Sequence, residues 1–219
     1  SAFYSAGQRC SALRVLYIQE EIYDNLLGMI KDATELLKIG DTTDFSNDIG
    51  PVIDKNSFDN LTRHIEEMQK AGFKIYAHPQ SGTLKCGNCF YPSIKEVNSI
   101  NDIPDENFGP ILHVIKYKSK NIDKIVDEIN NYGYGLTFGI HSRIEEKIEY
   151  LRSRIKAGNI YTNRSIVGAK VESQPFGGEN KSGTGFKAGG PHYLLKFMLE
   201  RTTSYNLTAI GGNVELLRG

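Results

Sequence analysis

The sequence has no tryptophan, few cysteines and no excess of charge of either sign. Its 219 residues include 26 basic and 26 acidic side chains, so the net charge is zero and we expect no nucleic-acid partner, which would need a basic face. Three cysteines cannot build a disulfide framework, and this favours a reducing compartment. No apolar run approaches the roughly 18 residues that span a bilayer, and no signal-peptide pattern opens the chain. Together these absences predict a folded, cytoplasmic protein.

The chain also lacks an initiator methionine, an internal repeat and a Pro/Ser-rich linker. It begins at Ser1 and reaches motif-like residues within its first ten positions. The composition, 39% hydrophobic and 24% charged, is typical of a globular domain. We therefore interpret the sequence as a compact segment of a longer protein.

Helical and extended patterns alternate along the chain. Apolar residues at three- and four-residue spacing predict amphipathic helices over 20–37, 56–71, 122–131 and 144–155. Runs of β-branched and aromatic residues predict strands over 73–77, 90–97, 111–117, 136–141 and 159–163, and residues 12–18 fit either a strand or a helix. This alternation predicts an α/β fold with a largely parallel sheet covered by helices. A glycine-rich loop over 165–191, a helix-like segment over 193–199 and an extended tail complete the chain.

Cys10 is the first candidate for chemistry. A nucleophilic thiol needs a turn that exposes the sulfur, a positive field, and N–H groups able to hold an oxyanion. Gly7 permits the turn and Arg9 adds positive charge. A helix starting near Ser11 would point its N–H dipoles at the sulfur. The alternative is a small buried hydrophobic side chain, which is the usual role of a free cysteine.

Cys86 and Cys89 form a C-x₂-C pair, with His78 eight residues before it. Structural zinc normally needs four ligands, and the sequence has no second pair of this kind. A thioredoxin-like redox pair would precede a helix, whereas this pair precedes a predicted strand. We therefore expect loop cysteines with no catalytic duty, and no metal site.

Two loops contain groups suited to polar ligands. Residues 105–110 (Asp-Glu-Asn-Phe-Gly-Pro) place carboxylates beside an aromatic ring at the edge of a predicted strand, where they could accept hydrogen bonds from ligand hydroxyls. The alternative is an ordinary solvated turn. Residues 174–191 are rich in glycine, and their N–H groups could form a nest for a carboxylate or phosphate; the alternative is a tightly turning surface connection. The loop has neither Walker A spacing nor the dinucleotide fingerprint.

Taken in order, these segments resemble the catalytic domain of the aldehyde dehydrogenase superfamily. The matching motifs are Gly7-Gln8-x-Cys10, Asp48-Ile49-Gly50-Pro51-Val52-Ile53, Glu106-x-Phe108-Gly109-Pro110, Tyr134-Gly135-Leu136-Thr137-x-Gly139, Gly158-Asn159-Ile160-Tyr161-Thr162-Asn163 and Pro175-Phe176-Gly177-Gly178-x-x-x-Ser182-Gly183. They span nearly the whole chain, so their combination is far more specific than any one motif.

Two further stretches point to one branch of the superfamily. Residues 8–12 (Gln-Arg-Cys-Ser-Ala) and 182–191 (Ser-Gly-Thr-Gly-Phe-Lys-Ala-Gly-Gly-Pro) resemble L-glutamate γ-semialdehyde (Δ1-pyrroline-5-carboxylate) dehydrogenases. The tail over 206–213 resembles that of the bifunctional proline utilisation A flavoenzymes. The resemblance thus places this segment in the C-terminal part of such a protein.

The resemblance implies NAD-dependent oxidation of the semialdehyde to glutamate, the second step of proline catabolism. Cys10 would attack the aldehyde carbon and carry first a hemithioacetal and then a thioester. The Cys10 backbone N–H would hold part of the oxyanion. Glu106 would bind the nicotinamide ribose hydroxyls, and Phe108 would pack beside the nicotinamide ring.

The resemblance also implies a set of substrate contacts. Ser11 and the backbone N–H groups of Gly189 and Gly190 would hold the carboxylate of the semialdehyde, which gives a physical reason for a loop without side chains. Phe197 would line the aliphatic part of the substrate.

Part of the implied active site is absent from this sequence. In the superfamily, an NAD-binding domain, a general-base glutamate and an oxyanion-hole asparagine precede the nucleophile, and only nine residues precede Cys10 here. We therefore expect residues 1–200 to be a catalytic-domain fragment, residues 201–219 to be an extended tail, and the isolated chain to be inactive. FAD would serve only an upstream proline dehydrogenase domain, and the full-length protein is expected to be a homo-oligomer.

Three alternatives stay open at this point. The first is a dehydrogenase for another semialdehyde, such as succinate semialdehyde; the diglycine at 189–190 favours glutamate semialdehyde instead. The second is a thiol acyltransferase or cysteine hydrolase that pairs Cys10 with one of the five histidines, for which the sequence shows no motif. The third is a non-catalytic binding or assembly module.

Overall fold

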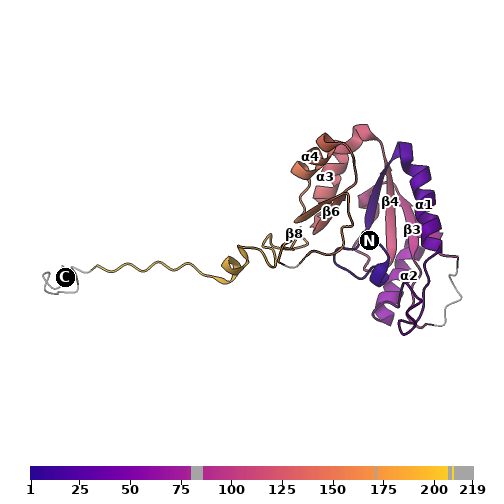
Figure 1. Ribbon diagram of the computed structural model, residues 1–219, viewed down its shortest axis with the longest axis horizontal. Coiled ribbons are helices and arrows are strands. Elements are labelled where there is room, and N and C mark those ends of the chain that lie inside the picture. The colour runs from indigo at the N-terminus through magenta and orange to yellow at the C-terminus, as the bar shows by residue number, and fades with distance from the viewer. Residues whose placement is uncertain (80–85, 171, 207–208, 210–219) are drawn as a thin grey trace.

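A four-stranded sheet forms the centre of the structure, a computed structural model that describes residues 1–79, 86–170, 172–206 and 209 (Figure 1). Its strands lie in the order β1 (Val15–Gln19), β4 (Ile111–Tyr117), β3 (Ser93–Val97) and β2 (Lys74–Ala77). β1 and β3 are parallel to β4, and β2 is antiparallel to β3. The predicted α/β fold with a largely parallel sheet is therefore confirmed.

Helices cover both faces of this sheet. Side chains alternate along β4, so Leu112 and Val114 point to one face while Ile111 and Ile115 point to the other. Helix α1 (Tyr23–Glu35) joins the cluster around Leu112 and Val114. Helix α2 (Lys55–Lys70) contributes to the two clusters that contain Ile111 and Ile115. β4 is apolar on both faces because it lies between two helical layers.

A smaller unit follows in the chain and lies beside the central sheet (Figure 1). It contains the helices α3 (Ile122–Tyr132) and α4 (Glu145–Arg154) and the short strands β5 (Tyr134–Gly135), β6 (Thr137–Ile140), β7 (Asn159–Thr162) and β8 (Glu179–Asn180). β6 and β7 are parallel with α4 between them in sequence, and β5 pairs antiparallel with β8. Five 3₁₀ turns complete the described elements: η1 (Tyr4–Gly7), η2 (Glu20–Ile22), η3 (Ile100–Asp102), η4 (Ser119–Asn121) and η5 (Tyr193–Phe197).

Local chemistry explains where two of the helices begin or end. The Asp54 side chain accepts a hydrogen bond of 2.7 Å from the backbone N–H of Ser57 and so caps the first turn of α2. Gly133 ends α3 in a left-handed conformation, with a φ of +92°, that a side chain would disfavour. The predicted helix boundaries at 56–71 and 122–131 lie within a residue of those observed for α2 and α3.

The structure corrects two predictions about the ends of the chain. No helix begins near Ser11, because residues 9–12 form a turn and the strand β1 follows. The expected helix-like segment over 193–199 is the shorter 3₁₀ turn η5, and residues 198–206 continue as an exposed tail that leads away from the sheets (Figure 1). The proposed domain boundary at residue 200 stays a prediction, and most of the tail pattern at 206–213 lies outside the described residues.

The two cysteines of the C-x₂-C pair are joined to each other. Cys86 and Cys89 form a disulfide, and Cys10 is the free cysteine. Cys89 is buried in the cluster beside α2. In the described part of the chain, no helix combines the length and the apolar character needed to cross a membrane.

Candidate active site

Cys10 lies on an exposed loop between η1 and β1. Three successive residues before it, Ser5, Ala6 and Gly7, have left-handed φ angles of +57°, +52° and +65°. Non-glycine residues adopt this conformation only where the surrounding structure imposes it. Since no helix follows Cys10, this strained turn, and not a helix N-terminus, places the thiol at the surface.

The turn before Cys10 packs directly against the turn that contains Glu106 and Phe108. A Cβ atom built on Gly7 would lie 2.1 Å from the carbonyl oxygen of Gly109. Gly7 and Gly109 are both buried, so the two backbones are in contact without an intervening side chain. The structure therefore brings together two motifs that are separated by about a hundred residues in sequence.

Gln8 connects the same loop to a third motif, residues 48–53. Its side-chain Oε1 accepts a hydrogen bond of 2.8 Å from the backbone N–H of Ile53, and its Nε2 donates to the carbonyl of Pro51 at 3.4 Å. A glutamine can make both contacts because its amide carries a donor and an acceptor. Gln8 thus has a structural role that explains its place beside Cys10.

Arg14 is the residue that sequence reasoning missed. Its Nη1 donates to the carbonyls of Gly7 at 2.5 Å and Gly109 at 3.2 Å, and its Nη2 donates to the carbonyl of Arg9 at 3.1 Å. Its Nε lies 3.6 Å from Glu106 Oε1, and the guanidinium carbon lies 4.6 Å from the centre of the Phe108 ring. Burial lowers the pKa of Arg14, and the charge of Glu106 opposes that effect.

Glu106 and Phe108 keep surface available for a ligand. The Glu106 side chain is 34% exposed although it pairs with Arg14, and Phe108 is 45% exposed. The neighbouring Asp105 is held by the backbone N–H of Glu106 and by the Tyr134 hydroxyl, and these hydrogen bonds lower the pKa of Asp105. The acidic turn is therefore an ordered structure in which Glu106 and Phe108 both stay accessible to a ligand.

Ser11 points away from the surface. Its residue is 4% exposed, and its Oγ accepts a hydrogen bond of 3.3 Å from the backbone N–H of Gly168. A second link, between the hydroxyls of Ser1 and Ser165, joins the same two segments. The glycine-rich region therefore contacts the Cys10 loop through residues 165–168.

The other predicted substrate residues lie apart from the Cys10 loop. Gly189 has a left-handed φ of +73°, and nothing lies within 4 Å of a Cβ built on it. The N–H of Gly190 donates to the carbonyl of Lys187. Phe197 is 68% exposed on η5, which Figure 1 places well away from the chain's N-terminus. Among the described residues, no hydrogen bond or ion pair joins these three residues to Cys10. Their substrate-binding roles stay predictions.

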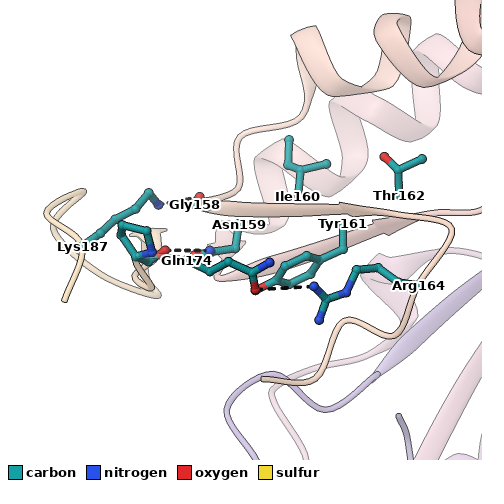
Figure 2. A pocket seen from close by; sticks show the side chains of 9 residues that line it. Gly158, Asn159, Ile160, Tyr161, Thr162, Arg164, Gln174 and Lys187 are labelled. Atoms are coloured by element: carbon teal, nitrogen blue, oxygen red, sulfur yellow. Dashed lines mark hydrogen bonds between the residues drawn. The ribbon is translucent and has the colours of Figure 1, made fainter. Parts of the chain in front are cut away.

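The remaining motifs meet in the smaller unit. Lys187 Nζ donates to the carbonyls of Gly158 at 2.5 Å and Gly177 at 2.8 Å, and the Ser182 hydroxyl accepts from the N–H of Gly135 at 3.0 Å. A pocket of about 480 Å³ opens here (Figure 2). Its lining residues are Gly158, Asn159, Ile160, Tyr161, Thr162, Arg164, Gln174, Pro175 and Lys187. None of the predicted site residues lines this pocket, so it is separate from the Cys10 site.

A buried polar cluster supports the backbone of Arg14 from inside the sheet. The carbonyl of Arg14 accepts hydrogen bonds from the backbone N–H of His113 at 2.9 Å and from its Nδ1 at 3.2 Å. Because that carbonyl can only accept, His113 carries its proton on Nδ1, and its Nε2 accepts from the Nε2–H of His64 at 3.0 Å. Burial lowers the pKa of His64 to about 4 and that of His113 to about 3.

Lys95 adds a buried ammonium group to this cluster. The residue is fully buried, its Nζ donates to the carbonyl of His64 at 3.4 Å, and burial lowers its pKa to about 7. The folded chain therefore releases this proton near pH 7, while the unfolded chain keeps it up to the ordinary pKa of 10.5. The free energy of unfolding therefore decreases as the pH falls from about 10 to 7, because the unfolded chain binds a proton at Lys95 that the folded chain does not. The two histidines lower stability further below their ordinary pKa of 6.5.

We expect Lys95→Met to raise the free energy of unfolding at pH 7 by a few kcal/mol, on the order expected when a buried charge is replaced by an apolar side chain. The loss of stability between pH 10 and pH 7 should also become smaller. Urea denaturation at both pH values measures this, with Lys147→Met, an exposed lysine on α4, as the control. A Lys95→Met variant with the same pH dependence as the parent chain would contradict this account.

Comparison with known proteins identifies relatives over nearly the whole chain. Residues 1–203 match a family described as the aldehyde dehydrogenase family. The chain is 48% identical to the bifunctional protein PutA of Rhizobium meliloti, over 89% of this chain and 16% of that protein. It is 38% identical to a 1-pyrroline-5-carboxylate dehydrogenase of Geobacillus sp. (strain WCH70), over 93% of this chain and 39% of that protein.

Solved structures agree with these sequence relatives. The crystal structure of a Bradyrhizobium japonicum proline utilization A (PutA) mutant superposes with a TM-score of 0.86 at 46% identity. The match covers 96% of this chain and 21% of that one. The chain thus spans well under half the length of each of these three relatives.

Proposed function

This chain belongs to the aldehyde dehydrogenase family, and on that premise we propose that it supplies the nucleophile of an NAD-dependent dehydrogenase for L-glutamate γ-semialdehyde. The observation that carries the proposal is the contact between two loops: an exposed free thiol lies on a turn that packs against the turn of Glu106 and Phe108. The similarity to proteins named 1-pyrroline-5-carboxylate dehydrogenase and PutA supports this substrate and a role in proline catabolism.

The proposed chemistry takes place at the sulfur of Cys10. The thiolate adds to the aldehyde carbon, and the carbonyl oxygen becomes the oxyanion of a hemithioacetal, which the Cys10 backbone N–H helps to hold. NAD, when bound, accepts the hydride that leaves this carbon. Cys10 then carries a thioester, and attack by water releases glutamate and regenerates the thiol. The exposed position of Cys10 suits this sequence, because both the substrate and water must reach the sulfur.

Glu106 and Phe108 fit the binding of the nicotinamide nucleotide. A carboxylate that is one-third exposed can accept hydrogen bonds from two ribose hydroxyls, and its ion pair with Arg14 helps to hold it in place. The exposed face of Phe108 offers an apolar surface beside the nicotinamide ring. Ser11, Gly189, Gly190 and Phe197 are proposed to contact the substrate only in the complete parent protein. In this chain Ser11 is buried and the N–H of Gly190 donates to Lys187, so these roles require a rearrangement of the glycine-rich loop.

We propose that other parts of a longer parent protein supply the rest of the active site, as the greater length of the relatives suggests. These parts would contain the general base, the oxyanion-hole asparagine and the NAD-binding domain. We therefore expect the isolated chain to show no turnover when it is mixed with NAD⁺ and the semialdehyde and followed at 340 nm. A chimera that carries this chain in place of the aligned segment of Rhizobium meliloti PutA is expected to show turnover. The parent protein is proposed to be a cytoplasmic homo-oligomer.

The same assay separates the proposal from its alternatives. The chimera should prefer L-glutamate γ-semialdehyde to succinate semialdehyde, because only the former presents an α-amino acid group to the glycine-rich loop. Robust turnover by the isolated chain would contradict the proposed division of the active site. A chimera that is folded by circular dichroism and binds NAD⁺, yet oxidises neither aldehyde, would overturn the proposed function and favour an assembly module.

A further inference from the structure

Resting on that proposed function, we propose that Arg14 is a positioning residue. Its guanidinium joins the loop of Cys10 to the turn of Glu106 and Phe108, and so keeps the nucleophile and the cofactor-contacting groups at a fixed separation. Arg14 has no place among the residues expected to contact substrate or cofactor. It acts through the two segments that it connects.

The hydrogen bonds of Arg14 reach carbonyls on both segments. Gly7 and Arg9 belong to the Cys10 loop, and Gly109 belongs to the turn that follows Phe108. Together these contacts restrict the Cys10 loop relative to the Gly109 turn, which lies 95 residues beyond Arg14 in sequence. The flat guanidinium group presents five N–H donors in a fixed arrangement, which suits it to several carbonyls at once.

The other contacts of Arg14 fix the two groups proposed to meet the cofactor. Its Nε lies 3.6 Å from the Glu106 carboxylate, and its flat face lies 4.6 Å from the Phe108 ring centre. The Arg14 side chain is only 17% exposed, so solvent screens these contacts weakly. One side chain thus orients the carboxylate and the ring while it holds the loop of the nucleophile.

The backbone of Arg14 is itself firmly held. It immediately precedes β1, and its carbonyl accepts two hydrogen bonds from His113 of β4. The guanidinium is therefore anchored to the central sheet, and both loops are positioned relative to that rigid element. A site built on a sheet in this way holds its geometry better than one formed by two loops alone.

Arg14→Lys is the informative substitution. A lysine keeps the positive charge beside Glu106, but its single ammonium group cannot reach three carbonyls and stack on Phe108 together. If the charge alone mattered, Arg14→Lys would behave like the parent chain. If positioning matters, Arg14→Lys and Arg14→Ala should both loosen the two segments.

Hydrogen exchange measured by mass spectrometry on the 219-residue chain and on the chimera tests this directly. The reporters are Gly7 and Gly109, whose N–H groups are hydrogen-bonded to Phe3 and Asn107. In both Arg14 variants we expect exchange in peptides covering 3–10 and 106–111 to speed up together by about tenfold or more, while peptides from β3 and α2 stay unchanged. The control is Arg152→Lys, because Arg152 pairs only with Glu149 of its own helix among the described contacts.

Kinetics of the chimera supply the second readout. Arg14→Lys should lower kcat by about 10- to 100-fold with little change in KM for the semialdehyde, since misplacement of reacting groups affects the chemical step. In Arg14→Ala, guanidinium ions at low millimolar concentration should partly restore kcat and partly slow hydrogen exchange in peptides 3–10 and 106–111. They should not affect Arg152→Lys.

The outcomes distinguish this proposal from the proposed function. Exchange that stays unchanged in Arg14→Lys, that speeds up in only one of the two segments, or that speeds up throughout the chain would overturn the positioning role. An active chimera whose kcat is insensitive to Arg14→Lys would overturn it as well. Coupled loosening of both segments in an inactive chimera would support the link between the loops and would instead contradict the proposed reaction.

Discussion

Cys10→Ser in the chimera is expected to lower kcat/KM for the semialdehyde by about 10³-fold or more, the scale of loss seen when a covalent nucleophile is removed. A serine hydroxyl has nearly the shape of the thiol, but it ionises far less readily and needs a neighbouring base to attack a carbonyl. Cys10 is exposed and free, so the substitution removes no buried contact. We therefore expect the fold and the NAD⁺ affinity to stay as they are.

The loss of kcat/KM in Cys10→Ser is measured from the absorbance at 340 nm. The unchanged NAD⁺ affinity is measured by fluorescence quenching. Iodoacetamide gives a second test, because among the three cysteines of this chain Cys86 and Cys89 form a disulfide and Cys10 is free. Alkylation of the chimera should remove turnover in proportion to the modified fraction of Cys10. Activity that survives either treatment would show that another group attacks the aldehyde.

Gly7→Ala is expected to destabilise the chain by about 2–4 kcal/mol, the range for a backbone strained in both conformation and packing. The added Cβ would lie 2.1 Å from the carbonyl oxygen of Gly109, and the residue has a φ of +65° that alanine disfavours. The clash is with backbone, so it can be relieved only by separating the Cys10 loop from the turn of Glu106. Turnover of the chimera should therefore fall together with stability.

Gly72→Ala is the matched control for Gly7→Ala. Gly72 also has a left-handed φ, of +84°, but nothing lies within 4 Å of a Cβ built on it. It therefore isolates the conformational cost, about 1 kcal/mol, from the clash. Urea denaturation of the two variants measures both costs. Equal destabilisation by the two substitutions, with unchanged turnover in each, would mean that the two loops are not in tight contact.

Much of the fold follows from the sequence because the core strands carry a clear local signal. The run over 111–117 is both apolar and β-branched, and the structure places β4 at those residues, buried on both faces. The amphipathic pattern over 56–71 likewise matches α2, since burial against the sheet selects the same apolar face that the spacing indicates.

The prediction of a helix near Ser11 is wrong because the apolar run that follows is compatible with either a helix or a strand. Residues 12–18 fit a helix or a strand, and pairing with β4 decides for the strand β1. The thiol is instead presented by the left-handed turn at Ser5, Ala6 and Gly7. The left-handed conformation of Ser5 and Ala6 could not be predicted, because neither residue is glycine. Only Gly7 among them carried a usable signal.

Arg14 could not be assigned from the sequence because its partners are backbone carbonyls. Gly7 and Gly109 have no side chains to mark a contact, and Glu106 lies 92 positions further along the chain. A single arginine at the start of a strand usually points to solvent. The buried Lys95 was hidden for the same reason, since nothing local distinguishes it from the exposed lysines of other strands.

The covalent step at Cys10 can be observed most directly by rapid acid quench of the chimera in its first turnover with NAD⁺ and L-glutamate γ-semialdehyde. Mass spectrometry of the digested protein should find a γ-glutamyl group on the peptide that contains Cys10, and should find none when NAD⁺ is omitted or in Cys10→Ser. Product formed in that turnover without an acyl group on this peptide, or with the group on another residue, would contradict the account.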